Sequence, residues 1–240
     1  MAAQKPDKGA ERDQGAEPGL AAKLNDFLRR NRVAAFAVLV TLVVGIAGVA
    51  VWSVVSEAAD AKAALAVEAA DASFAAWTSA PDAAAKSDLE ATLRAELEAL
   101  SARYGTDWPG LHAELLAARM VAEAGKWAEA ESLYAALARK APATSHVGPA
   151  AYRYAADAAE RAGANDRAAT LLNEFLAAWE GKAPGAERAH LALLRLAEAV
   201  RDYAAAREQY EVMVSRYPDS DWTKLAANRI LYLESQGLLD

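Results

Sequence analysis

A run of 24 residues without an ionisable side chain places the strongest constraint on the fold. It extends from Val33 to Ser56, between Arg32 and Glu57. At a helical rise of about 1.5 Å per residue, such a run covers the roughly 30 Å hydrocarbon core of a bilayer. A secretory signal peptide usually has a shorter apolar core nearer the N-terminus, and a core helix of a soluble domain usually carries a polar stripe. We therefore expect residues 33–56 to form a single transmembrane helix.

The charges that flank this run predict its orientation. Basic residues prevail before it, at Lys23, Arg29, Arg30 and Arg32, and acidic residues prevail after it, at Glu57, Asp60, Glu68 and Asp71. Flanks rich in Lys and Arg stay in the cytoplasm. The pattern therefore predicts a cytoplasmic N-terminus and a C-terminal domain on the other face of the membrane.

Two further features of the apolar run bear on its surroundings. Thr41, Gly45 and Gly48 fall on one side of the helix, where small side chains would let a second copy approach closely and form a homo-dimer. Trp52 is interpreted either as an anchor at the membrane interface or as one more lipid-facing side chain.

The segment before the run, residues 1–32, is expected to be a basic cytoplasmic tail. Residues 1–19 are rich in Gly, Pro and charge and bury too little apolar surface to offset the entropy of ordering, so disorder is expected. Leu20, Leu24 and Leu28 follow at a spacing of four. That stripe either lies on the membrane surface or extends the transmembrane helix.

Composition narrows the functional classes. The 240 residues include no cysteine, which excludes disulfides, thiolate zinc sites and cysteine nucleophiles. The net charge of −7 argues against nucleic-acid binding, which needs a basic surface. Abundant alanine after the apolar run favours helix throughout. Pro81 and Gly105 then divide residues 57–109 into two helices, a helical hairpin.

Three later segments align without gaps at an offset of 38 residues: Gly125–Pro142, Gly163–Glu180 and Arg201–Pro218. Their shared columns are Trp127, Asn165 and Tyr203, then Ala130, Ala168 and Ala206, then Tyr134, Leu172 and Tyr210. We expect the alanine column to lie where each of these helices crosses the preceding one, and the larger residues to fill the space between pairs. Such hairpins bury their apolar faces by stacking into a solenoid.

These segments resemble the second helix of tetratricopeptide repeats (TPR), with its G-x-Y-x-x-A-x-x-x-F/Y pattern. The resemblance implies an all-α fold in which the transmembrane helix precedes a TPR-like α-solenoid. Residues 57–109 would be a degenerate first repeat, 110–218 three repeats, and 219–240 a capping helix. Ser220 is the expected N-cap of that last helix, and its apolar stripe runs through Trp222, Leu225, Ile230 and Leu233. Two features depart from the pattern: the period exceeds the usual 34, and Leu194 stands where Ala118 and Ala156 match a small residue.

The whole layout resembles the single-pass ancillary subunit of the bacterial Sec translocon. This resemblance implies a location in the bacterial inner (cytoplasmic) membrane with a periplasmic repeat domain. It also implies protein partners: the translocon, periplasmic chaperones or envelope-assembly proteins. The C-terminal stretch from Tyr217 to Gly237 is also similar to envelope-assembly and cell-division coordinators. The function expected is that of a membrane-anchored adaptor or scaffold.

No catalytic motif stands out. His112, His146 and His190 are too far apart in sequence to share a helical turn, and Glu187 with His190 forms a single Glu-x-x-His where di-iron bundles use two. We therefore expect no metal, no cofactor and no enzymatic activity. The alternative is an envelope enzyme or ligand-binding domain with a pocket between repeats.

The first helices of the hairpins offer candidate partner-binding residues. In the expected register, the concave face presents Arg119, Arg153, Arg195 and Arg229. Guanidinium groups there could pair with acidic side chains or the C-terminal carboxylate of an extended peptide. The alternative is a solvated face with intrahelical ion pairs, such as Arg153 with Asp157 at i, i+4.

Overall fold

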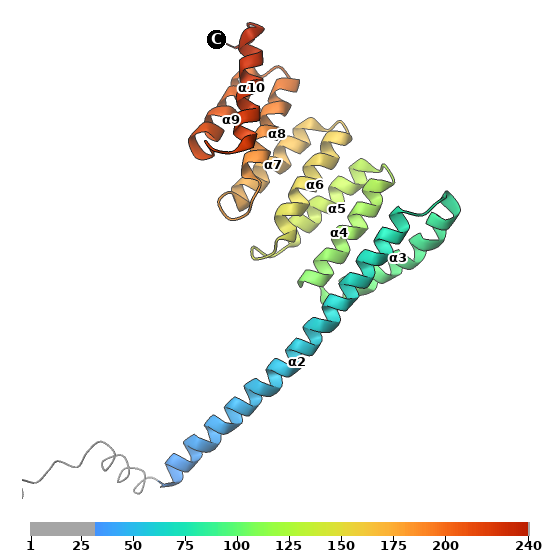
Figure 1. The fold of residues 1–240 in the computed structure, drawn as a ribbon, viewed down its shortest axis with the longest axis vertical. Coiled ribbons are helices and arrows are strands. Elements are labelled where there is room, and N and C mark those ends of the chain that lie inside the picture. Colours follow the sequence, from blue (N-terminus) through green and yellow to red (C-terminus); the bar gives the residue numbers. More distant parts are fainter. Residues whose placement is uncertain (1–31, 240) are drawn as a thin grey trace, which may run out of the picture. The chain divides into compact units, whose positions relative to one another are not determined.

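The computed structural model describes residues 32–239, and all regular secondary structure in that range is α-helical (Figure 1). The chain divides into two compact units between Asp60 and Ala61. Residues 1–31 of the expected tail, including the stripe of Leu20, Leu24 and Leu28, lie outside the described residues, and Arg32 is the first residue of α2.

Helix α2, Arg32–Thr78, is 47 residues long and includes the apolar run. Its stretch Val40–Thr78 is long and apolar enough to cross a membrane. The described large apolar side chains of the first unit are exposed, with Val33 84 % and Trp52 75 % accessible. Within the described part of that unit, nothing covers these side chains.

Eight further helices follow α2 in the described chain. They are α3 (Ala83–Tyr104), α4 (Trp108–Glu123), α5 (Trp127–Lys140), α6 (Val147–Arg161), α7 (Asn165–Trp179), α8 (Ala186–Ala199), α9 (Tyr203–Arg216) and α10 (Asp221–Ser235). Local signals explain several of their ends. The side chain of Asp82 accepts a hydrogen bond from Ala85 N at 2.8 Å, and that of Ser220 accepts one from Trp222 N at 3.2 Å, so both residues cap helices as N-caps usually do.

Each of these helices packs against the next, from α3 to α10. The apolar side chains form three clusters. The first joins Phe74 and Trp77 of α2 to α3 and α4, the second spans α4 to α8, and the third joins α8, α9 and α10. The described part of the second unit therefore has a nearly continuous core that follows the order of the chain.

The repeated columns lie in this core. Ala130, Ala168 and Ala206 are fully inaccessible to solvent. Tyr134 and Leu172 are buried, whereas the remaining apolar members of the columns are half-buried: Trp127, Tyr203 and Tyr210. The alanines therefore occupy the positions of closest packing, where a larger side chain would force neighbouring helices apart.

The prediction of one buried apolar stripe on α10 is partly wrong. Ile230 and Leu233 are buried together with Ala226, but Leu225 is 52 % accessible and Trp222 is also exposed. At 100° per residue, Leu225 lies about 140° around the helix from Ile230. Leu225 thus faces away from the core that α10 covers.

The turn between the two helices of each repeat shows one sequence conflict. Gly125 and Gly163 adopt positive φ values of 74° and 75°, and at the equivalent position Arg201 has φ 62°. A side chain in this left-handed region costs about 1–2 kcal/mol, whereas glycine adopts it readily.

Replacing Arg201 by glycine should therefore stabilise the protein. The strain relieved exceeds the chain entropy that glycine adds to the unfolded state, so the free energy of unfolding should rise by about 0.5–1 kcal/mol. Urea unfolding of the full chain in detergent micelles, followed by tryptophan fluorescence, measures this. Gly163→Ala is the matched control and should lower the urea midpoint. A lower midpoint for Arg201→Gly would contradict the strain argument.

Candidate functional site

The four arginines expected on the concave face have different partners. Arg195 of α8 pairs with Glu160 of α6 at 2.8 Å, and Arg229 of α10 pairs with Glu198 of α8, Nε to Oε2 2.6 Å. The guanidinium of Arg119 lies over the ring of Phe74, 4.7 Å from its centroid. Two of the four are therefore tied to the preceding first helix.

Arg153 does not pair with Asp157, contrary to the intrahelical alternative. Asp157 instead binds Arg161, Nε to Oδ2 3.1 Å. Helical side chains tilt toward the N-terminus, so Arg153 leans away from Asp157 while Arg161 leans back toward it. Arg153 is half-buried, and its Nε is buried without a hydrogen-bond partner among the described residues.

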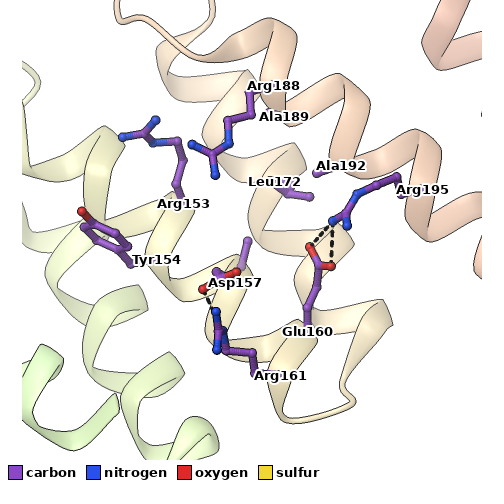
Figure 2. Close-up of a pocket in the computed structure, with 11 residues that line it drawn as sticks. Arg153, Tyr154, Asp157, Glu160, Arg161, Leu172, Arg188, Ala189, Ala192 and Arg195 are labelled. Carbon is purple, nitrogen blue, oxygen red and sulfur yellow. Dashed lines mark hydrogen bonds and ion pairs between the residues drawn. The ribbon is translucent and has the colours of Figure 1, made fainter. Parts of the chain in front are cut away.

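Arg153 borders a cavity of about 340 Å³ that lies between α6 and α8, with Leu172 of α7 in its wall (Figure 2). The charged residues of this cavity are Arg153, Asp157, Glu160, Arg161, Arg188 and Arg195. Figure 2 shows the ion pairs Asp157–Arg161 and Glu160–Arg195 toward one end and the side chains of Arg153 and Arg188 toward the other. Neither Arg153 nor Arg188 pairs with a described carboxylate.

A second cavity, of about 540 Å³, lies between α8 and α10. It is lined by Leu191, Arg195, Glu198, Ala199, Leu225 and Arg229. Because Arg195 lines both cavities, they adjoin along α8, and we call them together the α8 groove. The exposed Leu225 therefore lines the α8 groove and forms an apolar part of it. Arg188 lies over the ring of Trp222, 5.6 Å from its centroid.

Sequence reasoning selected Arg153 and Arg195, which line the first cavity, and Arg229, which lines the second. It missed Arg188 and Leu225 as groove residues. Arg188 lies seven residues before Arg195, two helical turns, so it shares that face of α8. This spacing is the signal that could have identified it.

A polar cluster around the buried His190 links α7, α8 and α9 away from the α8 groove. His190 is 6 % exposed, with Nε2 3.2 Å from Glu180 Oε1 and Nδ1 2.8 Å from Gln209 Oε1. Tyr217 donates a hydrogen bond to Glu180 at 2.9 Å, and Arg216 pairs with the same carboxylate at 2.7 Å. Glu187, which forms the Glu-x-x-His pattern with His190, is not in the cluster. The members of the cluster satisfy one another, which indicates a structural role.

No group of three His, Cys, Asp or Glu side chains that could hold a metal ion occurs among the described residues.

Hydrogen bonding and desolvation shift two pKa values in the polar cluster around His190. Desolvation by itself would raise the pKa of Glu180, but hydrogen bonds from Arg216, His190 and Tyr217 outweigh it and hold that pKa below its ordinary value of 4.5. Burial, reinforced by the hydrogen bond to Glu180, raises the pKa of Tyr217 to about 12. The folded protein therefore favours an ionised Glu180 beside a neutral Tyr217.

Replacing Glu180 by glutamine should lower the free energy of unfolding by about 1–2 kcal/mol at neutral pH, because charge-assisted hydrogen bonds are lost. A depressed folded pKa stabilises the protein above the unfolded value of 4.5, and that stabilisation is lost as pH falls through the folded pKa. The difference between wild type and Glu180→Gln should therefore shrink in acid.

Urea unfolding at neutral pH and in a series down to about pH 3 measures this difference. Glu211 on α9 is exposed and serves as the matched control. A pH-independent difference, or an equal effect of Glu211→Gln, would count against the role given to Glu180.

No protein-family model matches the sequence, and neither the curated proteins nor the solved structures include a significant match to it. Function is therefore inferred from the contacts, cavities and charges of the described residues.

Proposed function

We propose that this protein is a membrane-anchored scaffold that binds an acidic, extended segment of a partner protein in the α8 groove. One observation carries the proposal: neither Arg153 nor Arg188 in this groove has a described carboxylate partner. This is unexpected in a chain whose net charge is −7, because acidic side chains outnumber basic ones. A partner carboxylate could accept two parallel hydrogen bonds from either guanidinium.

The anchor is supported by the exposure of the apolar run. Val33 and Trp52 are among many large apolar side chains that no described residue of their unit covers. Contiguous apolar surface of this extent needs a lipid or protein environment. A helix satisfies its own backbone hydrogen bonds, as lipid requires. We infer that residues 33–56 cross the membrane with the basic flank in the cytoplasm.

The scaffold is supported by the order of helix packing. Consecutive helices pack against one another, and the alanine column is fully inaccessible in all three aligned segments. We infer a solenoid of helical hairpins similar to tetratricopeptide repeats, in which first helices line an extended binding surface. The α8 groove follows the first helices α6 and α8 and then α10, the expected capping helix, as such a surface would.

The chemistry of the groove suggests what it binds. The unmatched guanidinium groups select negative charge, and Leu191 with Leu225 offers an apolar contact farther along α8. A segment with a carboxylate and a nearby apolar side chain fits both parts. Translocon components, periplasmic chaperones and envelope-assembly proteins are the partner classes that the sequence resemblance suggests.

The membrane topology can be tested with protease and a tag at each end of the chain. Protease added outside bacterial spheroplasts should remove the C-terminal tag and leave the N-terminal tag intact. Val43→Lys, which puts a charge at mid-run, should reduce membrane integration because Lys costs about 2.5–3.5 kcal/mol at a helix centre. Protection of the C-terminal tag in intact spheroplasts would reverse the orientation and remove the compartment proposed for the partner.

The groove can be tested with a photocrosslinking amino acid at Leu225, in the native membrane at native expression. Leu133 of α5, exposed and outside the α8 groove, is the matched site. Discrete protein adducts should form from position 225 and not from 133. Arg188→Glu should reduce them about tenfold, equivalent to ~1.4 kcal/mol of binding free energy.

Lys126→Glu reverses an exposed cation elsewhere and should leave the adducts unchanged. If the adducts are the same from both positions, or are indifferent to Arg188→Glu, the α8 groove is not the binding surface.

A further inference from the structure

A separate cavity, of about 310 Å³, lies where the α5–α6 and α7–α8 loops meet the first turns of α6. We call it the loop cavity. Its polar lining consists of Thr144, Ser145, His146, Arg153 and Lys182, and no described carboxylate lines it. Its volume is at the lower end of the range for small-ligand pockets, about 300–1,000 Å³. The lining thus combines three groups able to carry positive charge with two hydroxyls.

Arg153 is the best-positioned of these groups. Its side chain lies beside Gly185, where φ is 107°, and a Cβ added to that glycine would lie 3.5 Å from Arg153 Nη1. The neighbouring Nε is buried without a hydrogen-bond partner among the described residues. No described carboxylate pairs with this guanidinium, so its positive charge favours an anion in the loop cavity.

The other two basic side chains, Lys182 and His146, lie on the loops and retain hydrogen-bond donors. Lys182 Nζ donates one hydrogen bond to Ala178 O at 3.0 Å, which leaves two of its three N–H groups. His146 is exposed, and no described carboxylate forms an ion pair with His146 or Lys182. Thr144 is exposed on the same loop. These groups come from two loops, so a ligand that bridges them must offer several acceptor atoms.

We propose that the loop cavity binds a phosphate monoester group. Such a group carries close to two negative charges at neutral pH and three acceptor oxygens. It could therefore engage Arg153, Lys182 and His146 together, where a single carboxylate has two oxygens and one charge. The end group of a phospholipid and a small soluble phosphate ester share this chemistry. The site does not depend on the partner proposed for the α8 groove.

The test uses the full chain in a non-ionic detergent and inorganic phosphate as the probe. Phosphate should raise Tm saturably, by roughly 3–8 °C well above its dissociation constant, relative to sodium chloride at equal ionic strength. His146→Ala and Lys182→Ala remove exposed side chains and should each raise the phosphate concentration needed for half the effect about fivefold or more. Lys126→Ala, an exposed cation outside the loop cavity, should leave it unchanged.

An equal Tm rise with chloride, or unchanged phosphate dependence in the His146→Ala, Lys182→Ala double variant, would overturn the proposal. Nanodiscs with and without phosphatidic acid, free of soluble phosphate, then separate the two sources. A Tm rise that needs His146 and Lys182 in phosphatidic acid nanodiscs assigns a lipid headgroup, and one confined to soluble phosphate assigns a small ester. Arg188 and Leu225 line the groove and not this cavity, so failure here is distinguishable from failure there.

Discussion

Close packing at alanine is the constraint on which the second unit depends. Ala130, Ala168 and Ala206 have no accessible surface, each where a second helix packs against its neighbours. With only a methyl group at these points, helix axes can approach closely. The larger side chains of the column that contains Tyr134, Leu172 and Tyr210 can then fill the remaining space. One face of α6, α8 and α10 borders the α8 groove, while the other faces of these helices contribute buried side chains to the core.

The charges on that exposed face divide into two kinds. Arg195–Glu160 joins α8 to α6 and Arg229–Glu198 joins α10 to α8, and at surface exposure such pairs contribute about 0–1 kcal/mol each. Their effect is mainly to neutralise the arginines. Arg153 and Arg188 are not neutralised by any described carboxylate, so the positive potential of the groove is concentrated at one end. In the proposed binding role, Arg153 and Arg188 are therefore the residues expected to select an acidic ligand.

The sequence predicted the features that depend on neighbouring residues or on a regular spacing. Ser220 caps α10 as expected, and the 38-residue offset alone was enough to identify Ala130, Ala168 and Ala206 as close-packed positions. The i, i+4 spacing alone suggested a pair between Arg153 and Asp157, whereas the N-terminal tilt of helical side chains, applied to the same sequence, favours Asp157 with Arg161. The sequence also could not predict that His190 contacts Glu180 and Gln209, because no periodicity connects these three positions.

Arg153 is the one point where the two proposed sites meet, because it lines both the α8 groove and the loop cavity. An anion on either side of this guanidinium lowers the positive potential on the other side. If both sites are occupied as proposed, linkage requires that each ligand weaken the other by the same factor. Arg188 would then be the groove cation least affected by phosphate in the loop cavity. The level of a small anion could thereby set how firmly the scaffold holds its acidic partner.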